Sequence, residues 1–218
     1  MSRIAIVTGG TRGIGAATSM ALKDKGCDVA ATYGSDDEKA KAFSEETGIK
    51  VFKWDVSDFE ACISGVARVE SDLGPVDILV NNAGITRDGT VHKMTYENWQ
   101  AVIDTNLGSC FNMSRAVIVG MRERKFGRIV NVGSINGQAG QYGQVNYAAA
   151  KSGIHGFTKA LAQEGAAAGV TVNAIAPGYV DTDMVAAVPE RVLEKIVGRI
   201  PVGRLGKATE IARSILFL

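Results

Sequence analysis

The chain has 218 residues with a formal net charge of +1, and 46% of them are hydrophobic. This composition supplies a sizeable core and excludes a generally disordered chain, while the balanced charge gives no broad attraction to nucleic acid or to a membrane. The three cysteines, Cys27, Cys62 and Cys110, are scattered, so neither a disulfide framework nor a metal site is predicted. No apolar run reaches transmembrane length and no signal-like segment opens the chain, so we expect a cytoplasmic protein.

Short apolar runs alternate with longer helix-like segments along the chain. In chain order, the pattern predicts strand 4–8, helix 14–25, strand 29–33, helix 36–47, strand 51–54, helix 58–73, strand 76–81, a helical region 95–124 interrupted near Asn106, strand 128–132, helix 146–168, strand 170–176 and helices 189–199 and 208–218. This alternation predicts an α/β fold, with one doubly wound parallel sheet, helices on both faces and a single domain over residues 1–218. In such sheets, ligands bind beyond the carboxyl ends of the strands.

A glycine-rich turn joins the first predicted strand to the first predicted helix. Its spacing, G-x-x-x-G-x-G, differs from the G-x-G-x-x-G dinucleotide fingerprint. Glycines nevertheless let the backbone approach a pyrophosphate closely, and the start of the helix offers unpaired N–H groups to it. The alternative is a turn that only lets helix and strand pack. The cofactor-binding residues predicted here are Gly9, Thr11, Arg12, Gly13, Ile14 and Gly15.

The end of the second predicted strand bears on the choice of cofactor. It ends at Tyr33 without the carboxylate that commonly bonds the ribose 2′-hydroxyl of NAD. Asp36 and Asp37 would argue for NAD if they folded inward, but at a helix start they suit N-terminal capping. The pattern therefore favours NADPH. The residues expected around its 2′-phosphate are Arg12, Gly34, Ser35 and Lys39.

Tyr147 and Lys151 are four residues apart on a predicted helix, so they share a face, and Ser134 follows the fifth strand. Taken singly, a helical tyrosine usually packs its ring and a helical lysine usually points to water. Together they suit the reduction of a ketone. A free tyrosine has a pKa of about 10, which a neighbouring ammonium and an oxidised nicotinamide would lower. Ser134 would hold the carbonyl oxygen, where negative charge develops.

Several motifs, taken together, resemble those of the short-chain dehydrogenase/reductase family over nearly the whole chain. These motifs are residues 8–15, Asn81-Asn82-Ala83-Gly84, Asn106, Ser134, Tyr147-x-x-x-Lys151 and Pro177-Gly178. The resemblance implies a Rossmann-type fold with an Asn–Ser–Tyr–Lys catalytic set. Tyr147 would be the acid/base, Ser134 would orient the substrate, Lys151 would lower the tyrosine pKa and hold the nicotinamide ribose, and Asn106 would anchor a proton-relay water. Further cofactor contacts would come from Asp55, Val56, Asn82, Ala83, Gly84, Pro177, Gly178, Val180 and Thr182.

Two segments, residues 81–88 and 134–147, resemble more narrowly the acetoacetyl-CoA reductases of polyhydroxyalkanoate synthesis. That resemblance implies an acyl-CoA substrate, reduced from acetoacetyl-CoA to (R)-3-hydroxybutanoyl-CoA. The sibling group, the 3-oxoacyl-acyl-carrier-protein reductases, remains the alternative, with the basic residues 122–128 as a docking patch; the uncharged stretch 165–169 weakens it. The expected substrate-binding residues are Asp88, Gln141, Tyr142, Gln144 and Tyr179, although the glutamines would also serve simply to fill a loop.

The sequence stops within an apolar run, residues 215–218, that reads as the middle of a helix. The resemblance implies a further strand beyond it, so we expect a sheet that lacks the family's last strand, with an exposed edge at the sixth strand. The family forms homotetramers, and weakened assembly, or a dimer, would follow. A dinucleotide-binding module with little turnover is a second alternative function. Residues 181–204 are expected to form a lid that moves when substrate binds.

Overall fold

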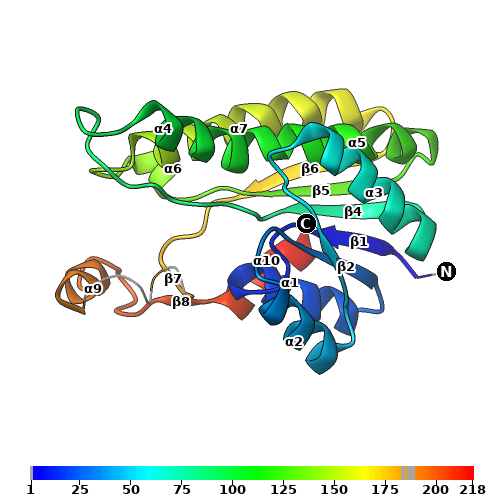
Figure 1. The fold of residues 1–218 in the computed structure, drawn as a ribbon, viewed down its shortest axis with the longest axis horizontal. Helices are drawn as coiled ribbons and strands as arrows, with labels where there is room; N and C mark the ends of the chain where they lie inside the picture. The colour runs from blue at the N-terminus through cyan, green and yellow to red at the C-terminus, as the bar shows by residue number, and fades with distance from the viewer. Residues whose placement is uncertain (1, 183–184, 186–189) are drawn as a thin grey trace.

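Six parallel strands form the central sheet of the computed structural model, in the order β3-β2-β1-β4-β5-β6 (Figure 1). The structure describes residues 2–182, 185 and 190–218. The strands are β1 (Ile4–Val7), β2 (Asp28–Tyr33), β3 (Lys50–Lys53), β4 (Val76–Asn81), β5 (Gly127–Val132) and β6 (Val170–Ile175). The strand order reverses between β1 and β4, which confirms the predicted doubly wound topology and places a ligand site at that crossover.

Helices cover both faces of the sheet, as Figure 1 shows. On one face lie α1 (Gly13–Asp24), α2 (Asp37–Thr47) and α10 (Ala208–Phe217), which contribute Leu22, Phe43 and Ile215 to one hydrophobic core. On the other face lie α3 (Phe59–Leu73), α5 (Ser109–Glu123) and α7 (Val145–Ala166). Strands covered on both faces are apolar throughout, which is why the sequence shows them as continuous apolar runs.

The helical region predicted at residues 95–124 changes its geometry at the predicted place. It consists of α4 (Tyr96–Ile103), a π-helical turn η1 (Asp104–Gly108) and α5. Asn106 lies in the π-turn and is 1% exposed. The predicted interruption is therefore one widened turn within a continuous helical segment, and such turns occur often at functional sites.

Three short elements carry no sequence signal because they are too short to show a period. They are α6 (Asn136–Ala139) and the parallel pair β7 (Val180–Asp181) and β8 (Gly206–Lys207). Within the expected lid, residues 181–204, the structure describes the last residue of β7 and the helix α9 (Glu190–Val197). Residues 183–184 and 186–189 lie outside the described residues, including the first residue of the helix expected at 189–199, so the lid stays a prediction.

The strand β6 lies at one edge of the sheet. Across the described residues it pairs with β5 and with no other strand, as expected from the sequence. Thr171 is exposed, and Asn173, Ala174 and Ile175 are partly exposed. In the described part of the chain, no helix combines the length and the apolar character needed to cross a membrane.

Candidate active site

The predicted site residues come together at the carboxyl edge of the sheet. Asn81 of β4 is in register with Asn131 of β5, and Val132 of β5 with Ile175 of β6, so the loops that follow these strands start side by side. The loop after β5 is further joined to the loop after β6, because Ile135 N–H donates to Pro177 O at 2.9 Å. Ser134 and the Pro177-Gly178 segment are therefore neighbours, as the motifs predicted.

The glycine-rich turn is bonded directly to the loop after β4. The Asn82 amide donates to the carbonyls of Thr8 and Gly9, at 2.9 and 3.2 Å, and the Thr8 hydroxyl accepts from Ala83 N–H at 3.0 Å. A Cβ atom at Gly15 would lie 2.0 Å from Gly9 O, so only glycine fits there. These contacts hold two of the predicted cofactor-binding segments in one rigid unit.

The residues of this turn fit a dinucleotide phosphate. The helix α1 begins at Gly13, its N-cap residue Arg12 makes no side-chain capping bond, and its first turn contains no acidic residue. The N–H groups and the positive end of the helix dipole are thus left to an anion. Thr182 lies against the same turn, because a Cβ atom at Gly13 would be 3.3 Å from its Cγ2. The segment predicted to face the nicotinamide therefore reaches the glycine-rich turn.

Charged side chains beyond β2 and β3 pair with one another. Asp36 caps α2 by accepting from Lys39 N–H at 3.1 Å, as predicted, and its other oxygen lies 3.8 Å from Lys39 Nζ. Asp37 accepts from Lys53 Nζ at 2.7 Å, and bonds to Lys53 and then to Tyr33 lower the pKa of its carboxyl. The expected phosphate partner Lys39 thus has a carboxylate beside it. Lys53 escaped the sequence reasoning, because only the register that pairs it with Tyr33 brings it here.

The segment expected to face the adenine follows β3. The Asp55 carboxylate accepts from Ser57 N–H at 2.9 Å, so it orders its own turn. Val56 is buried, and its carbonyl accepts from the amide of Asn112, on α5, at 3.0 Å. Asn112 is a supporting residue that sequence reasoning missed, since it is separated from Val56 by 56 residues and lies on another element.

Lys151 is almost completely buried beside Tyr147. The lysine is 4% exposed, its Nζ donates to Val132 O at 2.7 Å, and it lies 5.7 Å from the centroid of the Tyr147 ring. Burial lowers the pKa of Lys151 to about 8. The pKa of Tyr147 is raised, first by burial and also by the charge of Asp88, while a hydrogen bond with Ser134 lowers it. This differs from the expected lowering, because the Lys151 ammonium bonds a main-chain carbonyl and burial disfavours the phenolate.

Asn106 holds the loop after β4. Its Nδ2 donates to Ile85 O at 2.9 Å and to Val102 O at 2.8 Å, and its Oδ1 accepts from Ile85 N–H at 3.2 Å. A Cβ atom at Gly84 would lie 2.4 Å from this oxygen and 3.6 Å from Lys151 Nζ. Asn106, Gly84 and Lys151 are therefore brought together. The side-chain amide of Asn106 is used in fixing the loop, and its role with a relay water stays a prediction.

The expected substrate-binding residues divide into two groups. Asp88 and Gln144 bond each other, with Gln144 Nε2 donating to Asp88 Oδ2 at 2.9 Å. Gln141 is exposed, and Tyr142 is 88% exposed. Tyr179 is partly exposed, and its carbonyl accepts from Gly206 N–H at 2.9 Å, which ties it to β8. The first pair joins the loop after β4 to the start of α7, and the substrate-binding roles of all five residues stay predictions.

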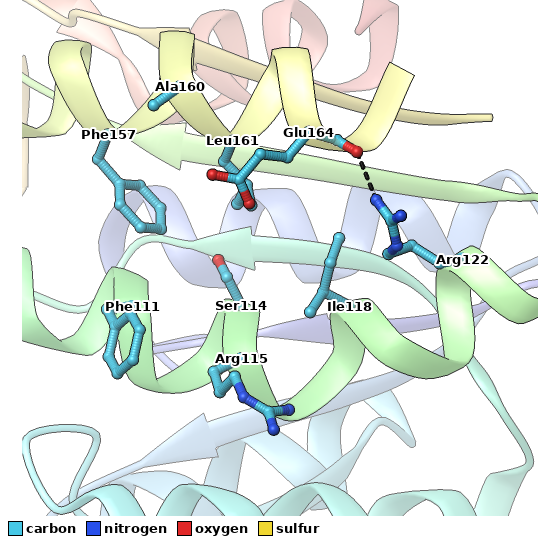
Figure 2. Close-up of a pocket in the computed structure, with 9 residues that line it drawn as sticks. All are labelled: Phe111, Ser114, Arg115, Ile118, Arg122, Phe157, Ala160, Leu161 and Glu164. Atoms are coloured by element: carbon cyan, nitrogen blue, oxygen red, sulfur yellow. Dashed lines mark hydrogen bonds between the residues drawn. The ribbon is translucent and has the colours of Figure 1, made fainter. Parts of the chain in front are cut away.

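A groove of about 560 Å³ lies elsewhere, between α5 and α7 (Figure 2). None of the predicted catalytic residues lines it. From α5 come Phe111, Ser114, Arg115, Ile118 and Arg122, and from α7 come Phe157, Ala160, Leu161 and Glu164. The groove is therefore a feature of the outer helical face, separate from the site at the carboxyl edge.

Comparison with known proteins gives a family model and close relatives. The model described as short chain dehydrogenase matches residues 3–192. An acetoacetyl-CoA reductase of Rhizobium meliloti (strain 1021) is 66% identical over 100% of this chain and 91% of its own length. Another, of Shinella zoogloeoides, is 65% identical over the same shares. A 3-oxoacyl-[acyl-carrier-protein] reductase of Haemophilus influenzae is 44% identical over 99% of this chain and 90% of its own length.

Proposed function

Because the chain belongs to the short-chain dehydrogenase family, we propose that it reduces acetoacetyl-CoA to (R)-3-hydroxybutanoyl-CoA, with NADPH as the cofactor. The proposed substrate rests on one observation: three relatives named acetoacetyl-CoA reductase are 60% or more identical to this chain. Relatives named 3-oxoacyl-[acyl-carrier-protein] reductase are 44% identical. The proposal includes a place in polyhydroxybutyrate synthesis, and the expected location is the cytoplasm.

The cofactor would lie along the carboxyl edge of the sheet. The glycine-rich turn and the start of α1 would hold its pyrophosphate, since their N–H groups are free of side-chain caps. Arg12, Ser35 and Lys39 would face the 2′-phosphate, with Gly34 at the turn between them. Asp55 and Val56 would border the adenine. Towards the nicotinamide, contacts would come from Asn82, Ala83, Gly84, Tyr147, Lys151, Pro177, Gly178, Val180 and Thr182.

The reduced nicotinamide, when bound, supplies the hydride that reduces the β-carbon of the thioester. Ser134 would orient the substrate, because its Oγ accepts from Asn136 N–H at 3.2 Å and its hydrogen bond with Tyr147 sets its hydroxyl beside the proton donor. Tyr147 would then give its phenolic proton to that oxygen. Since burial raises the pKa of Tyr147, the phenol carries its proton at neutral pH, which is the form a reduction requires. The Lys151 ammonium would stabilise the phenolate left behind.

The position of the basic residues supports CoA over a carrier protein. Arg124, in the basic patch at residues 122–128, donates from Nη2 to Val76 O at 2.5 Å, at the first residue of β4. Ser134 follows the other end of the neighbouring strand, and a six-residue strand spans about 20 Å. An acidic protein docked on this patch would lie at the opposite edge of the sheet from Tyr147. The patch is therefore poorly placed to deliver a carrier-bound substrate.

Assembly into a homotetramer, or a dimer, belongs to the same proposal. The groove in Figure 2 supports it, because Phe111 is 53% exposed at its mouth and both walls carry apolar side chains. Arg115 lies on the α5 wall and Glu164 on the α7 wall. A two-fold axis would bring each wall against the opposite wall of a second copy, so the charges would complement each other. Sedimentation of the 218-residue chain tests this, and a monomer at high concentration would contradict it.

The test of substrate and cofactor is a turnover comparison on one enzyme preparation. Acetoacetyl-CoA and acetoacetyl-carrier protein are each assayed with NADPH and with NADH. We expect the highest kcat/KM for acetoacetyl-CoA with NADPH. A strong preference for the carrier-bound substrate would contradict the proposed substrate, and comparable turnover with NADH would contradict the proposed preference for NADPH. Tight NADPH binding without turnover of either substrate would support the dinucleotide-binding module instead.

A further inference from the structure

A series of hydrogen bonds, the first from a main-chain N–H and the next two between side chains, runs from Ser134 to the loop after β4. Ser134 Oγ accepts from Asn136 N–H at 3.2 Å, and Asn136 Nδ2 donates to Gln144 Oε1 at 2.9 Å. The other end of the Gln144 amide donates to Asp88 Oδ2 at 2.9 Å. Each group is used once and in the correct donor or acceptor sense, so the series fixes how the Gln144 amide points. The carboxylate of Asp88 is thereby held in one orientation.

The loop after β4 and the start of α7 are also joined by hydrogen bonds to main-chain carbonyls. Gly89 N–H donates to Gly143 O at 2.7 Å, and the buried Asn146 donates from Nδ2 to Arg87 O at 2.9 Å. Asp88 therefore lies against the start of α7, one turn before Tyr147. That helix start has no acidic residue in its first turn, and its N-cap residue Gln144 makes no side-chain capping bond. The negative charge that favours a helix start is supplied here by a neighbouring loop.

We propose that Asp88 is a positioning residue for the reaction proposed above: its carboxylate, fixed by Gln144, holds the Tyr147 phenol in its protonated form and so sets the site for reduction rather than oxidation. The physical reason is repulsion, because the carboxylate is fixed against Gln144, one helical turn before Tyr147, and would disfavour a second negative charge on the phenol. In agreement, the charge of Asp88 adds to burial in raising the pKa of Tyr147. The role rests on the proposed function, since it assumes that Tyr147 is the proton donor.

The other charges around Tyr147 leave this effect in place. The titratable and charged groups on the elements around Tyr147 are Lys151 and His155 on α7, Cys110 on α5, Arg87, Asp88, His92 and Lys93 in the loop after β4, Tyr96 and Glu97 on α4, Asp104 on η1, Tyr142 before α7, and Tyr179 and Asp181 after β6. The Lys151 ammonium is bonded to Val132 O, and Asp104 accepts from Gln100 Nε2 at 2.6 Å. Among the described residues, Asp88 is the charged group whose charge raises the pKa of Tyr147.

The test is the pH dependence of kcat/KM in both directions for the wild type and Asp88→Asn. The asparagine keeps an acceptor for Gln144 and removes the charge. We expect the alkaline limb of reduction and the acidic limb of oxidation to move down together, by roughly half a pH unit or more, because Asp88 is exposed and partly screened. Gln144→Met, which frees the carboxylate, should give a smaller shift in the same direction. Glu46→Gln, an exposed charge removal on α2, is the matched control and should give none.

Superimposable profiles for Asp88→Asn and the wild type would overturn the proposal, and so would lost activity without a shift, which indicates a contact to substrate alone. A readout without turnover separates this from the proposed function. The Tyr147 phenolate is followed by its ultraviolet absorbance, as the difference between each protein and its Tyr147→Phe derivative. We expect the midpoint in Asp88→Asn to fall. An unchanged midpoint overturns the proposal, even if acetoacetyl-CoA proves not to be the substrate.

Discussion

At the carboxyl edge of the sheet, the half beyond β4 and β5 is held by buried hydrogen bonds, whereas the half beyond β2 and β3 is held by exposed ion pairs. Beyond β4 and β5, Asn106 and Lys151 are buried and bonded to main-chain carbonyls. Beyond β2 and β3, the side chains of Asp37, Lys39 and Lys53 are about half exposed or more and lie beside opposite charges. Buried groups with fixed partners hold one geometry, whereas exposed ion pairs are screened and rearrange at little cost. Under the proposed function, the half that would carry the chemistry is therefore rigid, and the half that would select the cofactor can rearrange.

A methyl group at Gly15, at the seam between the two halves, should have the largest effect on cofactor binding. In Gly15→Ala, the new Cβ would lie 2.0 Å from Gly9 O, a main-chain atom that has no room to move. We expect a loss of NADPH affinity of roughly 10- to 100-fold, equivalent to the strain of overpacking. Cofactor titration by nicotinamide fluorescence measures it. Gly156→Ala is the matched control, because nothing lies within 4 Å of its added Cβ; an equal loss there would show that the turn is not special.

The buried lysine should make the stability of the protein depend on pH. Its pKa in the folded protein is about 8, below the ordinary 10.5, so between these values the unfolded chain holds the extra proton. Lys151 should therefore contribute a rise of on the order of 3 kcal/mol in the free energy of unfolding across this window. Burial raises the pKa of Cys62 to about 12 and that of Cys110 to about 11, so these thiols contribute a fall above pH 9 that the wild type and a Lys151 variant share. Urea unfolding of the wild type and Lys151→Met at steps between pH 8 and 10.5 measures the difference, which should rise by this amount; a difference that stays constant with pH would contradict the assignment.

Substitutions in the half beyond β2 and β3, where the adenosine of the cofactor would lie, should change kcat/KM less and with only one of the two cofactors. Arg12 is exposed, and it would pair with the 2′-phosphate. In Arg12→Met we expect kcat/KM with NADPH to fall by about tenfold, the scale of one charge-assisted bond, with NADH unaffected. Steady-state kinetics with both cofactors measures the ratio. Equal losses for NADPH and NADH would place Arg12 at the pyrophosphate instead of at the 2′-phosphate.

The sequence predicts the periodic and sequentially local parts of the molecule well. All six sheet strands follow from apolar runs, and the strand–turn–helix at residues 4–25 follows from its glycines. The interruption at Asn106 was also predicted in place, since a functional polar residue in a long helical pattern marks it. Tyr147 and Lys151 share a face because their spacing matches one helical turn.

The parts that the sequence does not predict depend on contacts between distant segments. Lys53 meets Asp37 through the register of β2 and β3, and Asp88 meets Gln144 across 56 residues. Neither contact can be recognised from a local pattern in the sequence. The raised pKa of Tyr147 in this structure was not predicted from the sequence, because its largest cause is burial, which only packing determines.

The central claim is that Tyr147 donates the proton at a site that is formed independently of it. The direct measurement compares Tyr147→Phe with the wild type in single-turnover reduction of acetoacetyl-CoA, with NADPH affinity measured on the same samples. Removing one hydroxyl leaves the ring and the buried Lys151 bond to Val132 in place. We predict a fall in rate of about 100- to 10,000-fold, the contribution of general acid catalysis, with NADPH affinity unchanged. A near-normal rate in this variant would contradict the account.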